Sequence, residues 1–156
     1  MNYEIRRGNL SDLPRLQRLF YNTVTSVGIK AYTKAEIRIW TRHFSDTAYW
    51  ESKFIHNNFY VAALHAEIVG FISLSNTGYI DNIYVSHKYQ RKGIANLLYT
   101  RIEAVAKEYN FKELTTDISH LAKPFFEKKG FEILKENHHK IDGETLVNFS
   151  AKKVLD

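Results

Sequence analysis

One stretch near the middle of the chain, Gly78–Tyr99, has the pattern of a strand, a short basic loop and an amphipathic helix in immediate succession. The loop, Gln90–Ala95, lies where the following helix exposes its unpaired backbone N–H groups. Those donors and the positive end of the helix dipole favour a bound phosphate. Gly93 has no Cβ to keep a ligand from the backbone, and Arg91 and Lys92 add positive charge. The stretch therefore predicts a site for a pyrophosphate group.

The sequence lacks two common nucleotide-binding fingerprints. It contains no G-x-G-x-x-G motif, which argues against a Rossmann-type dinucleotide site, and no G-x-x-x-x-G-K-[ST] motif, which argues against a P-loop. What remains is the loop Gln-Arg-Lys-Gly-Ile-Ala after a strand-like run, Tyr79–Val85. This arrangement resembles the acetyl-CoA loop of the GCN5-related N-acetyltransferase (GNAT) superfamily, written Q/R-x-x-G-x-G/A.

Two further segments resemble the same superfamily. Tyr3–Pro14 looks like its opening, a first strand followed by a helix that begins at Ser11 or Asp12. Ala122–Phe131 looks like its late helix, which ends in a Gly-Phe step. The three segments stand in the right order and spacing. The similarity covers most of the chain and is weakest over residues 30–58.

The resemblance implies acetyl-CoA as the cofactor and places it against one strand and one loop. In the superfamily the pantetheine arm pairs with the backbone at the end of the fourth strand, which here is Asp81–Val85 and includes Ile83, Tyr84 and Val85. A backbone N–H near Val85 would then stabilise the oxyanion that forms when the thioester is attacked. The resemblance also assigns cofactor binding to Gln90, Arg91, Lys92, Gly93, Ile94, Ala95 and Asn96.

Two residues of the same strand are candidates for proton transfer. An amine must be neutral to attack, and an alkylammonium has a reference pKa of about 10.4. Asp81 lies in an otherwise apolar and aromatic strand, where a carboxylate is costly unless it is hydrogen-bonded or functional. It is either the base or only an acceptor of bonds from neighbouring groups. Tyr84 is a candidate donor to the departing thiolate, or else it packs and hydrogen-bonds.

The superfamily's usual proton donor is a tyrosine four residues before the glycine that closes the late helix. That position is Phe126 here, and Ser119 stands where the superfamily often has an asparagine. The resemblance places both residues at the cofactor, but phenylalanine cannot donate a proton. Either the thiolate leaves unassisted, since a thiol is acidic enough for that, or another group donates.

We expect the acceptor site within residues 30–58, the segment that resembles the superfamily least. This segment is rich in aromatic residues. Tyr32 precedes a helix start at Thr33 and is the candidate for lining an aromatic pocket. Trp40 and Phe44, four residues apart, fit the hydrophobic core better. We therefore expect the acceptor to be an amine of a small molecule or a peptide.

Composition narrows the class of protein further. The chain has 156 residues, of which 44% are hydrophobic and 25% charged, as expected for one globular domain over residues 1–156. The absence of cysteine excludes disulfides and an acyl-cysteine route. The histidines lack metal-ligand spacing, because the adjacent His138 and His139 point to opposite faces of a strand. We therefore expect no metal site.

The net charge of +5 comes from basic residues scattered among acidic ones. Solvated helix faces explain this pattern better than nucleic-acid binding, and an RNA-associated protein is a weaker alternative. No apolar stretch approaches the length of a membrane span, and the N-terminus has no signal core. We expect a cytoplasmic protein without a membrane partner, and the resemblance is compatible with a homodimer.

Periodicity and turn residues predict alternating elements along the chain. The predicted strands cover residues 3–7, 59–64, 68–74, 79–85, 112–117, 131–140 and 146–153. Two predicted helices begin near Ser11 and near Asp46. Three more cover residues 33–44, 91–109 and 120–129. Gly130 would end the last helix, and Asp142-Gly143 would form a hairpin turn. We expect an α/β (α+β) single-domain fold, a GNAT-like mixed and largely antiparallel central sheet flanked by helices.

These observations predict an acetyl-CoA-dependent N-acetyltransferase that acts by direct attack of the amine on the thioester. A ping-pong route is disfavoured, because the chain has no cysteine and no recognisable activated serine. The alternative is a non-catalytic acyl-CoA-binding module that serves as a sensor or an interaction surface. The phenylalanine at position 126 is the feature that supports this alternative.

Overall fold

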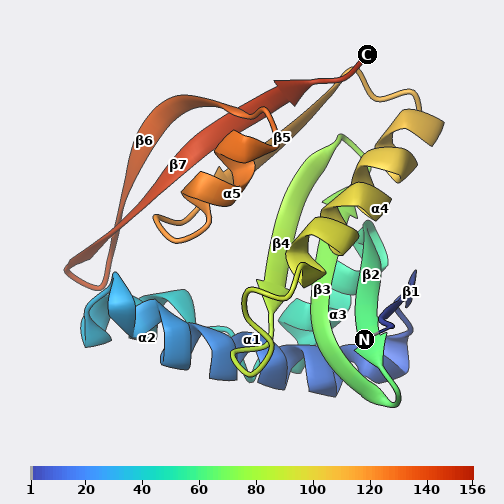
Figure 1. The fold of residues 1–156 in the computed structure, drawn as a ribbon. Coiled ribbons are helices and arrows are strands. Elements are labelled where there is room, and N and C mark those ends of the chain that lie inside the picture. Colours follow the sequence, from blue (N-terminus) through green and yellow to red (C-terminus); the bar gives the residue numbers. More distant parts are fainter. Residues whose placement is uncertain (1) are drawn as a thin grey trace.

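The computed structural model describes residues 2–156, and its centre is a seven-stranded sheet with the strand order β1-β2-β3-β4-β5-β7-β6 (Figure 1). The strands are β1 (Glu4–Arg7), β2 (Asn57–Leu64), β3 (Glu67–Ser75), β4 (Tyr79–Val85), β5 (Glu113–Ile118), β6 (Glu132–Ile141) and β7 (Glu144–Val154). Within the described residues only β4 and β5 pair in parallel. The prediction of a mixed, largely antiparallel sheet flanked by helices is confirmed.

Helices cover both faces of the sheet and enclose two hydrophobic cores. The α-helices are α1 (Leu13–Val27), α2 (Lys34–Trp40), α3 (Thr47–His56), α4 (Ile94–Glu108) and α5 (Lys123–Lys128), with 3-10 turns at Leu10–Asp12 and Gly28–Lys30. One core joins α4 and α5 to the sheet through residues such as Ile102 and Phe126. The other joins α1 and α3 to the opposite face through Leu16, Trp50 and Phe71. No helix within residues 2–156 combines the length and apolar character needed to cross a membrane.

The sheet opens at its centre, where β4 and β5 stop pairing. Their parallel register includes only Tyr79 opposite Thr115 and Ile80 opposite Thr116. On the other side of β4 the register with β3 shifts at the same level, because Asn82 faces Ser73 whereas Ile80 faces Leu74. Asp81 is the extra residue of this β-bulge, which bends the strand. Beyond the bulge, β4 continues to pair with β3, and β5 continues to pair with β7. The strands β4 and β5 therefore diverge (Figure 1).

Most predicted elements are present, and their ends differ for local reasons. The β6–β7 turn holds Asp142 and Gly143 at φ values of +50° and +80°, and Gly130 follows α5 at +93°, as predicted for a hairpin turn and a helix end. The helix predicted to reach Phe44 instead ends at Trp40. The Thr41 hydroxyl and backbone N–H both donate to the Ile37 carbonyl, and the chain continues as turns.

Two other helices begin later than predicted. The helix predicted from residue 91 begins at Ile94, because Arg91 and Gly93 have φ values of +60° and +82°, which no right-handed helix accommodates. The helix predicted from His120 begins at Lys123. The Ser119 hydroxyl accepts a hydrogen bond from the Ala122 N–H, and this bond holds the intervening residues in a turn.

A buried carboxylate anchors the start of α1 to β1. Asp12 is 1% exposed and accepts bonds from Arg6 (2.9 and 3.1 Å), from Arg15 (2.7 Å) and from the Asn9 backbone N–H (2.7 Å). The hydrogen bond from Arg6 is the largest cause that lowers the pKa of Asp12, and the Asn9 N–H and the two positive charges act in the same direction against burial. Asp12 is therefore ionised in the folded protein.

We predict that Asp12→Asn lowers the free energy of unfolding by about 2 kcal/mol at neutral pH, as expected for lost hydrogen bonds to a charged group. Because the pKa of Asp12 is lower in the folded protein, its contribution is present above the unfolded value of about 3.9 and is lost as the pH falls through the folded value. Urea unfolding from pH 7 to pH 2 tests this. The difference in unfolding free energy between wild type and variant should stay constant above about pH 5 and should shrink as the pH falls below the unfolded value. A difference that does not change with pH would contradict the assignment.

Candidate active site

The loop after β4 ends in an uncapped helix N-terminus. Gly93 precedes the first residue of α4, and no side chain caps the helix. No group in the described chain accepts a hydrogen bond from the backbone N–H groups of residues 91–96. A Cβ placed on Gly93 would meet nothing within 4 Å, so the space in front of this backbone is open. These free donors and the helix dipole, at the start of a fifteen-residue helix, are an arrangement that favours a bound anion.

A cavity of about 680 Å³ lies between this loop, the end of β4 and the α5 region. Except for Lys92, which is exposed to solvent outside it, every residue predicted to bind the cofactor lines this cavity. These residues are Ile83, Tyr84, Val85, Gln90, Arg91, Gly93, Ile94, Ala95, Asn96, Ser119 and Phe126. Residues of α1, among them Thr23 and Val24, complete the wall. The structure thus brings the predicted strand and loop residues together around one space.

The backbone of β4 offers unpaired groups to this cavity. The Ser86 N–H donates to the Val69 carbonyl (2.8 Å), which makes these two residues a hydrogen-bonded pair of the β3–β4 ladder. Because such pairs alternate with non-hydrogen-bonded pairs, the N–H and C=O groups of Val85 and Ile83 point away from β3. They point toward β5, which no longer pairs with β4 at this level. An extended ligand arm could therefore pair with β4 here, as an added strand does.

Gln90 supports the loop from inside the protein. Its side-chain amide donates to the carbonyls of Val85 (2.6 Å) and Ser86 (3.2 Å). The Thr23 hydroxyl also donates to the Val85 carbonyl (3.4 Å). The carbonyl of Val85 is thus occupied, whereas its N–H remains the group that faces the gap. This arrangement gives the Gln90 side chain a role in shaping the site.

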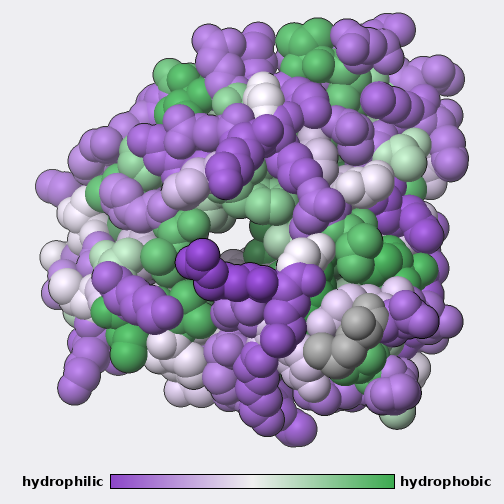
Figure 2. Space-filling model, in the orientation of Figure 1, coloured by the Kyte–Doolittle hydropathy of each residue, from purple (hydrophilic) through white to green (hydrophobic). Residues whose placement is uncertain are grey.

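A second cavity, of about 170 Å³, lies on the other side of the gap between β4 and β5. The two cavities share six lining residues, Trp40, Ile83, Tyr84, Ser119, Ala122 and Phe126, and so meet at the gap. Figure 2 shows a hollow near the middle of the molecule, with polar residues in front and apolar ones behind. Two reactants that enter from opposite sides could meet there.

Asp81 lines the second cavity and is paired with a cation. Its Oδ2 lies 2.9 Å from Nζ of Lys53 in α3, and the Asn82 amide is 3.5 Å away. Burial disfavours the charged form of Lys53, but the hydrogen bond and the charge of Asp81 outweigh it, so the pKa of Lys53 is raised. The bulge turns the Asp81 carboxylate into this cavity, where it can also receive a second cationic group.

Tyr84 lies where the two cavities meet. Its hydroxyl accepts a bond from the Trp40 indole N–H (3.1 Å), and its ring packs edge-on against Phe20 (5.0 Å between centroids). Burial raises the pKa of Tyr84 above its ordinary value, although the bond from Trp40 acts in the opposite direction. No group in the described chain accepts the proton of this hydroxyl, so the proton is available to a ligand.

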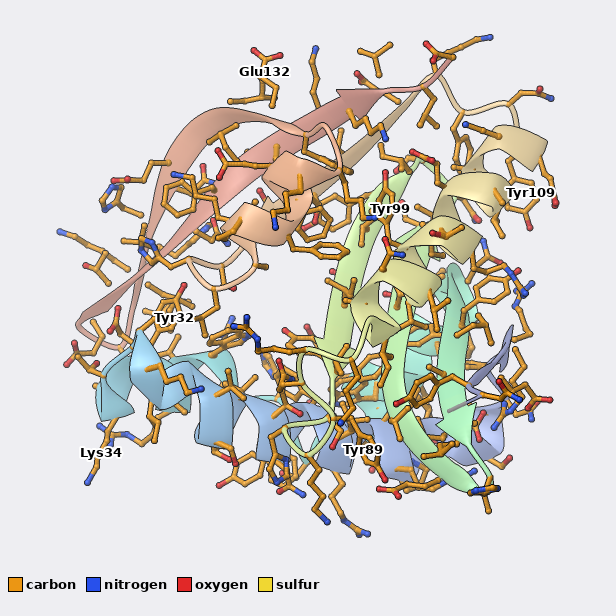
Figure 3. All side chains as sticks on the ribbon, in the orientation of Figure 1. Tyr32, Lys34, Tyr89, Tyr99, Tyr109 and Glu132 are labelled. Carbon is orange, nitrogen blue, oxygen red and sulfur yellow. The ribbon has the colours of Figure 1, made fainter. Side chains whose placement is uncertain are left out.

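Tyr32 lines the second cavity, as the sequence predicts for a pocket residue. Figure 3 places it beside α2, beneath the β6–β7 hairpin. Its hydroxyl accepts a bond from the His120 backbone N–H (2.9 Å) and donates to the Val147 carbonyl (3.5 Å). The ring meets Trp40 edge-on, with 5.2 Å between centroids. Tyr32 therefore ties the segment between α1 and α2 to the far half of the sheet across this cavity.

Phe126 is fully buried and belongs to the hydrophobic core, with its ring edge-on to Phe125 and Phe131. It lines both cavities but brings no proton to them. Ser119 also lines both cavities, and its hydroxyl accepts the Ala122 N–H bond. Tyr84, in contrast, places a phenol hydroxyl, which can donate a proton, where the two cavities meet.

Sequence reasoning missed several residues of the site. Trp40, interpreted as core, lies partly in the core but also lines both cavities. Lys53 and Asp117 were not singled out, although Asp117 follows the last residue of β5 that pairs with β4, as Asp81 follows the last residue of β4 that pairs with β5. Acidic residues at matching positions on two neighbouring strands are the signal that could have found Asp117.

Comparison with known proteins agrees with this geometry. The family described as "Acetyltransferase (GNAT) domain" matches residues 29–152. The uncharacterized N-acetyltransferase YafP of Escherichia coli (strain K12) is 33% identical over 148 residues, 95% of this chain and 93% of that protein. The crystal structure of a GCN5-related N-acetyltransferase (Aminotransferase, Class-II) from Rhodopseudomonas palustris matches with a TM-score of 0.93 and 25% identity, over 99% of this chain and 97% of that chain.

A further solved structure is similar over the whole fold. The PaiA N-acetyltransferase of Thermoplasma acidophilum, solved in complex with coenzyme A, has a TM-score of 0.76 and 21% identity, over 99% of this chain and 100% of that chain. The fold and site define a mixed α/β acyltransferase architecture. The chain belongs to the GCN5-related N-acetyltransferase (GNAT) family.

Proposed function

We propose that this protein transfers an acetyl group from acetyl-CoA to an amine of a small molecule or peptide, by direct attack of the amine on the thioester. The observation that carries this proposal is the meeting of two cavities at the gap between β4 and β5. One cavity holds an open anion site at the start of α4, and the other holds carboxylates that suit a cationic amine. The transfer would take place between them.

The residues present fit acetyl-CoA. The free N–H groups of residues 91–96 suit its pyrophosphate, and the open space at Gly93 lets the phosphates approach the backbone. The unpaired N–H and C=O of Ile83 and the unpaired N–H of Val85 suit the amides of the pantetheine arm. The PaiA N-acetyltransferase, which shares the fold, was solved in complex with coenzyme A. When bound, acetyl-CoA would supply an activated acetyl group as a thioester.

We assign the proton transfers to the chain's own residues. Asp81 binds the ammonium form of the acceptor and takes a proton from it, directly or through a water molecule. The Val85 N–H donates to the oxygen that becomes negative during attack. As the new N–C bond forms and the C–S bond breaks, the nitrogen loses a second proton to solvent, and Tyr84 donates its proton to the sulfur and regains one from solvent. The net products are the acetylated amine, CoA thiol and one proton.

A non-catalytic acyl-CoA-binding module is the second candidate, because Phe126 stands where many family members carry a proton-donating tyrosine. The free hydroxyl proton of Tyr84 favours the enzyme. Release of free thiol from acetyl-CoA in the presence of amine pools distinguishes the two. Binding of acetyl-CoA without amine-dependent thiol release would establish the binding module instead.

We predict that Gly93→Glu weakens acetyl-CoA binding by more than about tenfold, because it puts a side chain and a negative charge into an anion site. Gly143→Glu is a matched control. Gly143 has a φ of +80°, close to the +82° of Gly93, and the space around its Cβ is also open. Both variants should lose about 1 kcal/mol of stability through backbone strain. Calorimetric titration should show loss of affinity for the first only, and equal affinities would refute the anion site.

We predict that Asp81→Asn lowers kcat by roughly 100-fold, the usual range for loss of a general base. Tyr84→Phe should lower kcat by only about tenfold, because a thiolate is a good leaving group. Since burial raises the pKa of Tyr84, its phenol stays protonated to at least about pH 10, and the wild-type rate should show no alkaline loss below that pH. Acetyl-CoA affinity of both variants is the control. Unchanged kcat in both variants would remove these assignments.

A further inference from the structure

The second cavity, which we call the acceptor cavity, carries an unusual charge for this chain. Its lining contains two carboxylates, Asp81 and Asp117, and no lysine, arginine or histidine. The protein as a whole has a net charge of +5. The cavity is therefore a local negative region in a basic protein, and it attracts cations.

The two carboxylates differ in their partners. Asp81 is paired with Lys53, whereas Asp117 has no cationic group within 4.0 Å in the described chain. Neutral donors from three strands hold Asp117 instead. These are the Tyr79 hydroxyl (2.8 Å), the Ser150 hydroxyl (2.7 Å) and, more weakly, the Asn137 amide (3.5 Å). The Asp117 carboxylate is fixed in place with its charge uncompensated.

The fold places both carboxylates on the same side of the gap. They follow Ile80 and Thr116, the last paired residues of β4 and β5. The hydrogen bond from Tyr79 crosses between these strands and holds the Asp117 carboxylate beside β4. Burial, together with the bond to Asp117 and its charge, raises the pKa of Tyr79, so its hydroxyl stays protonated and continues to donate.

We propose that the acceptor is a small amine with two ammonium groups, and that Asp117 binds the ammonium that is not acetylated. The reacting amine lies at the junction near Asp81 and Tyr84, and the second ammonium lies at Asp117. The aromatic walls Tyr32 and Trp40 accommodate the carbon chain between the charges and add cation–π attraction. This inference rests on the proposed acetyl transfer and adds to it the class of acceptor.

The size of the acceptor cavity favours a small molecule. At about 170 Å³ it accommodates a slender chain such as a linear diamine. Asp117 itself is exposed to solvent, so the second charge keeps contact with water and is not fully desolvated. An ion pair of this kind contributes modestly and is screened by salt.

The test compares acceptors that differ only in the second charge. Putrescine, cadaverine and hexamethylenediamine are each paired with butylamine, pentylamine or hexylamine of the same length, and thiol release from acetyl-CoA is measured at low salt. We expect kcat/KM for at least one diamine to exceed that of its monoamine by about fivefold, beyond the statistical factor of two for two equivalent amines, as expected for a partly exposed ion pair. The preference should shrink as salt is added.

Asp117→Asn should reduce this preference to the statistical factor by lowering kcat/KM for diamines more than for the monoamines of the same length. Glu108→Gln is the matched control, because it removes one negative charge from an exposed position at the end of α4. It should leave the preference intact. Asp117→Lys should shift selectivity toward 5-aminovalerate, in which a carboxylate replaces one terminal aminomethyl group of cadaverine. Affinity for acetyl-CoA and thermal unfolding show whether each variant is folded.

The outcomes separate this inference from the proposed function. Acetylation of monoamines and diamines with equal efficiency after the statistical correction, or a diamine preference that survives Asp117→Asn, would overturn the role of Asp117 and leave acetyl transfer standing. A wild-type protein that neither binds acetyl-CoA nor releases thiol with any amine would overturn the proposed function, and the acceptor class with it.

Discussion

The early end of β4–β5 pairing is the constraint on which the site depends. Two strands of one sheet separate after a single stretch of parallel pairing, and the bulge at Asp81 bends β4 at that level. The separation leaves backbone donors and acceptors of β4 without a strand partner in the interior of the protein. Unpaired backbone groups are costly when buried, so the open gap calls for water or a ligand that pairs with them. Both cavities exist because of this gap.

Three long-range contacts hold the side chains around the gap. Trp40 donates to Tyr84 across 44 positions of sequence, Lys53 donates to Asp81 across 28, and Tyr79 donates to Asp117 across 38. Each contact crosses from a helix or a neighbouring strand to the divergent part of β4 or β5. Together these contacts determine which polar groups around the gap can still bond to a ligand. The proton of Tyr84 and the charge of Asp117 remain available, and both face the space where an acceptor would lie.

Residues predicted from local patterns gather around the larger cavity, whereas fewer of the residues that line the acceptor cavity were predicted. Residues 90–96 were predicted from one continuous stretch, because a loop that opens into a helix determines its own free N–H groups. Lys92 was the exception, since its side chain points to solvent outside the cavity. Tyr32 was predicted to line a pocket, but Trp40 was interpreted as core. The four-residue spacing of Trp40 and Phe44 predicts that one helix face is buried. A partly buried residue can also line a cavity, as Trp40 does.

The sequence by itself determined the α/β pattern, the turns at Gly130 and Asp142-Gly143, and the uncapped helix N-terminus before α4. These features depend on periodicity, φ angles and helix ends, which neighbouring residues control. Only the tertiary structure decided that Asp81 pairs with Lys53, that Phe126 lies in the core and that Tyr84 stands at the junction of the cavities. It also decided that Asp117 lacks a cationic partner. Such facts depend on contacts between segments far apart in the chain, where strand register and the bulge in β4 set which side chains meet.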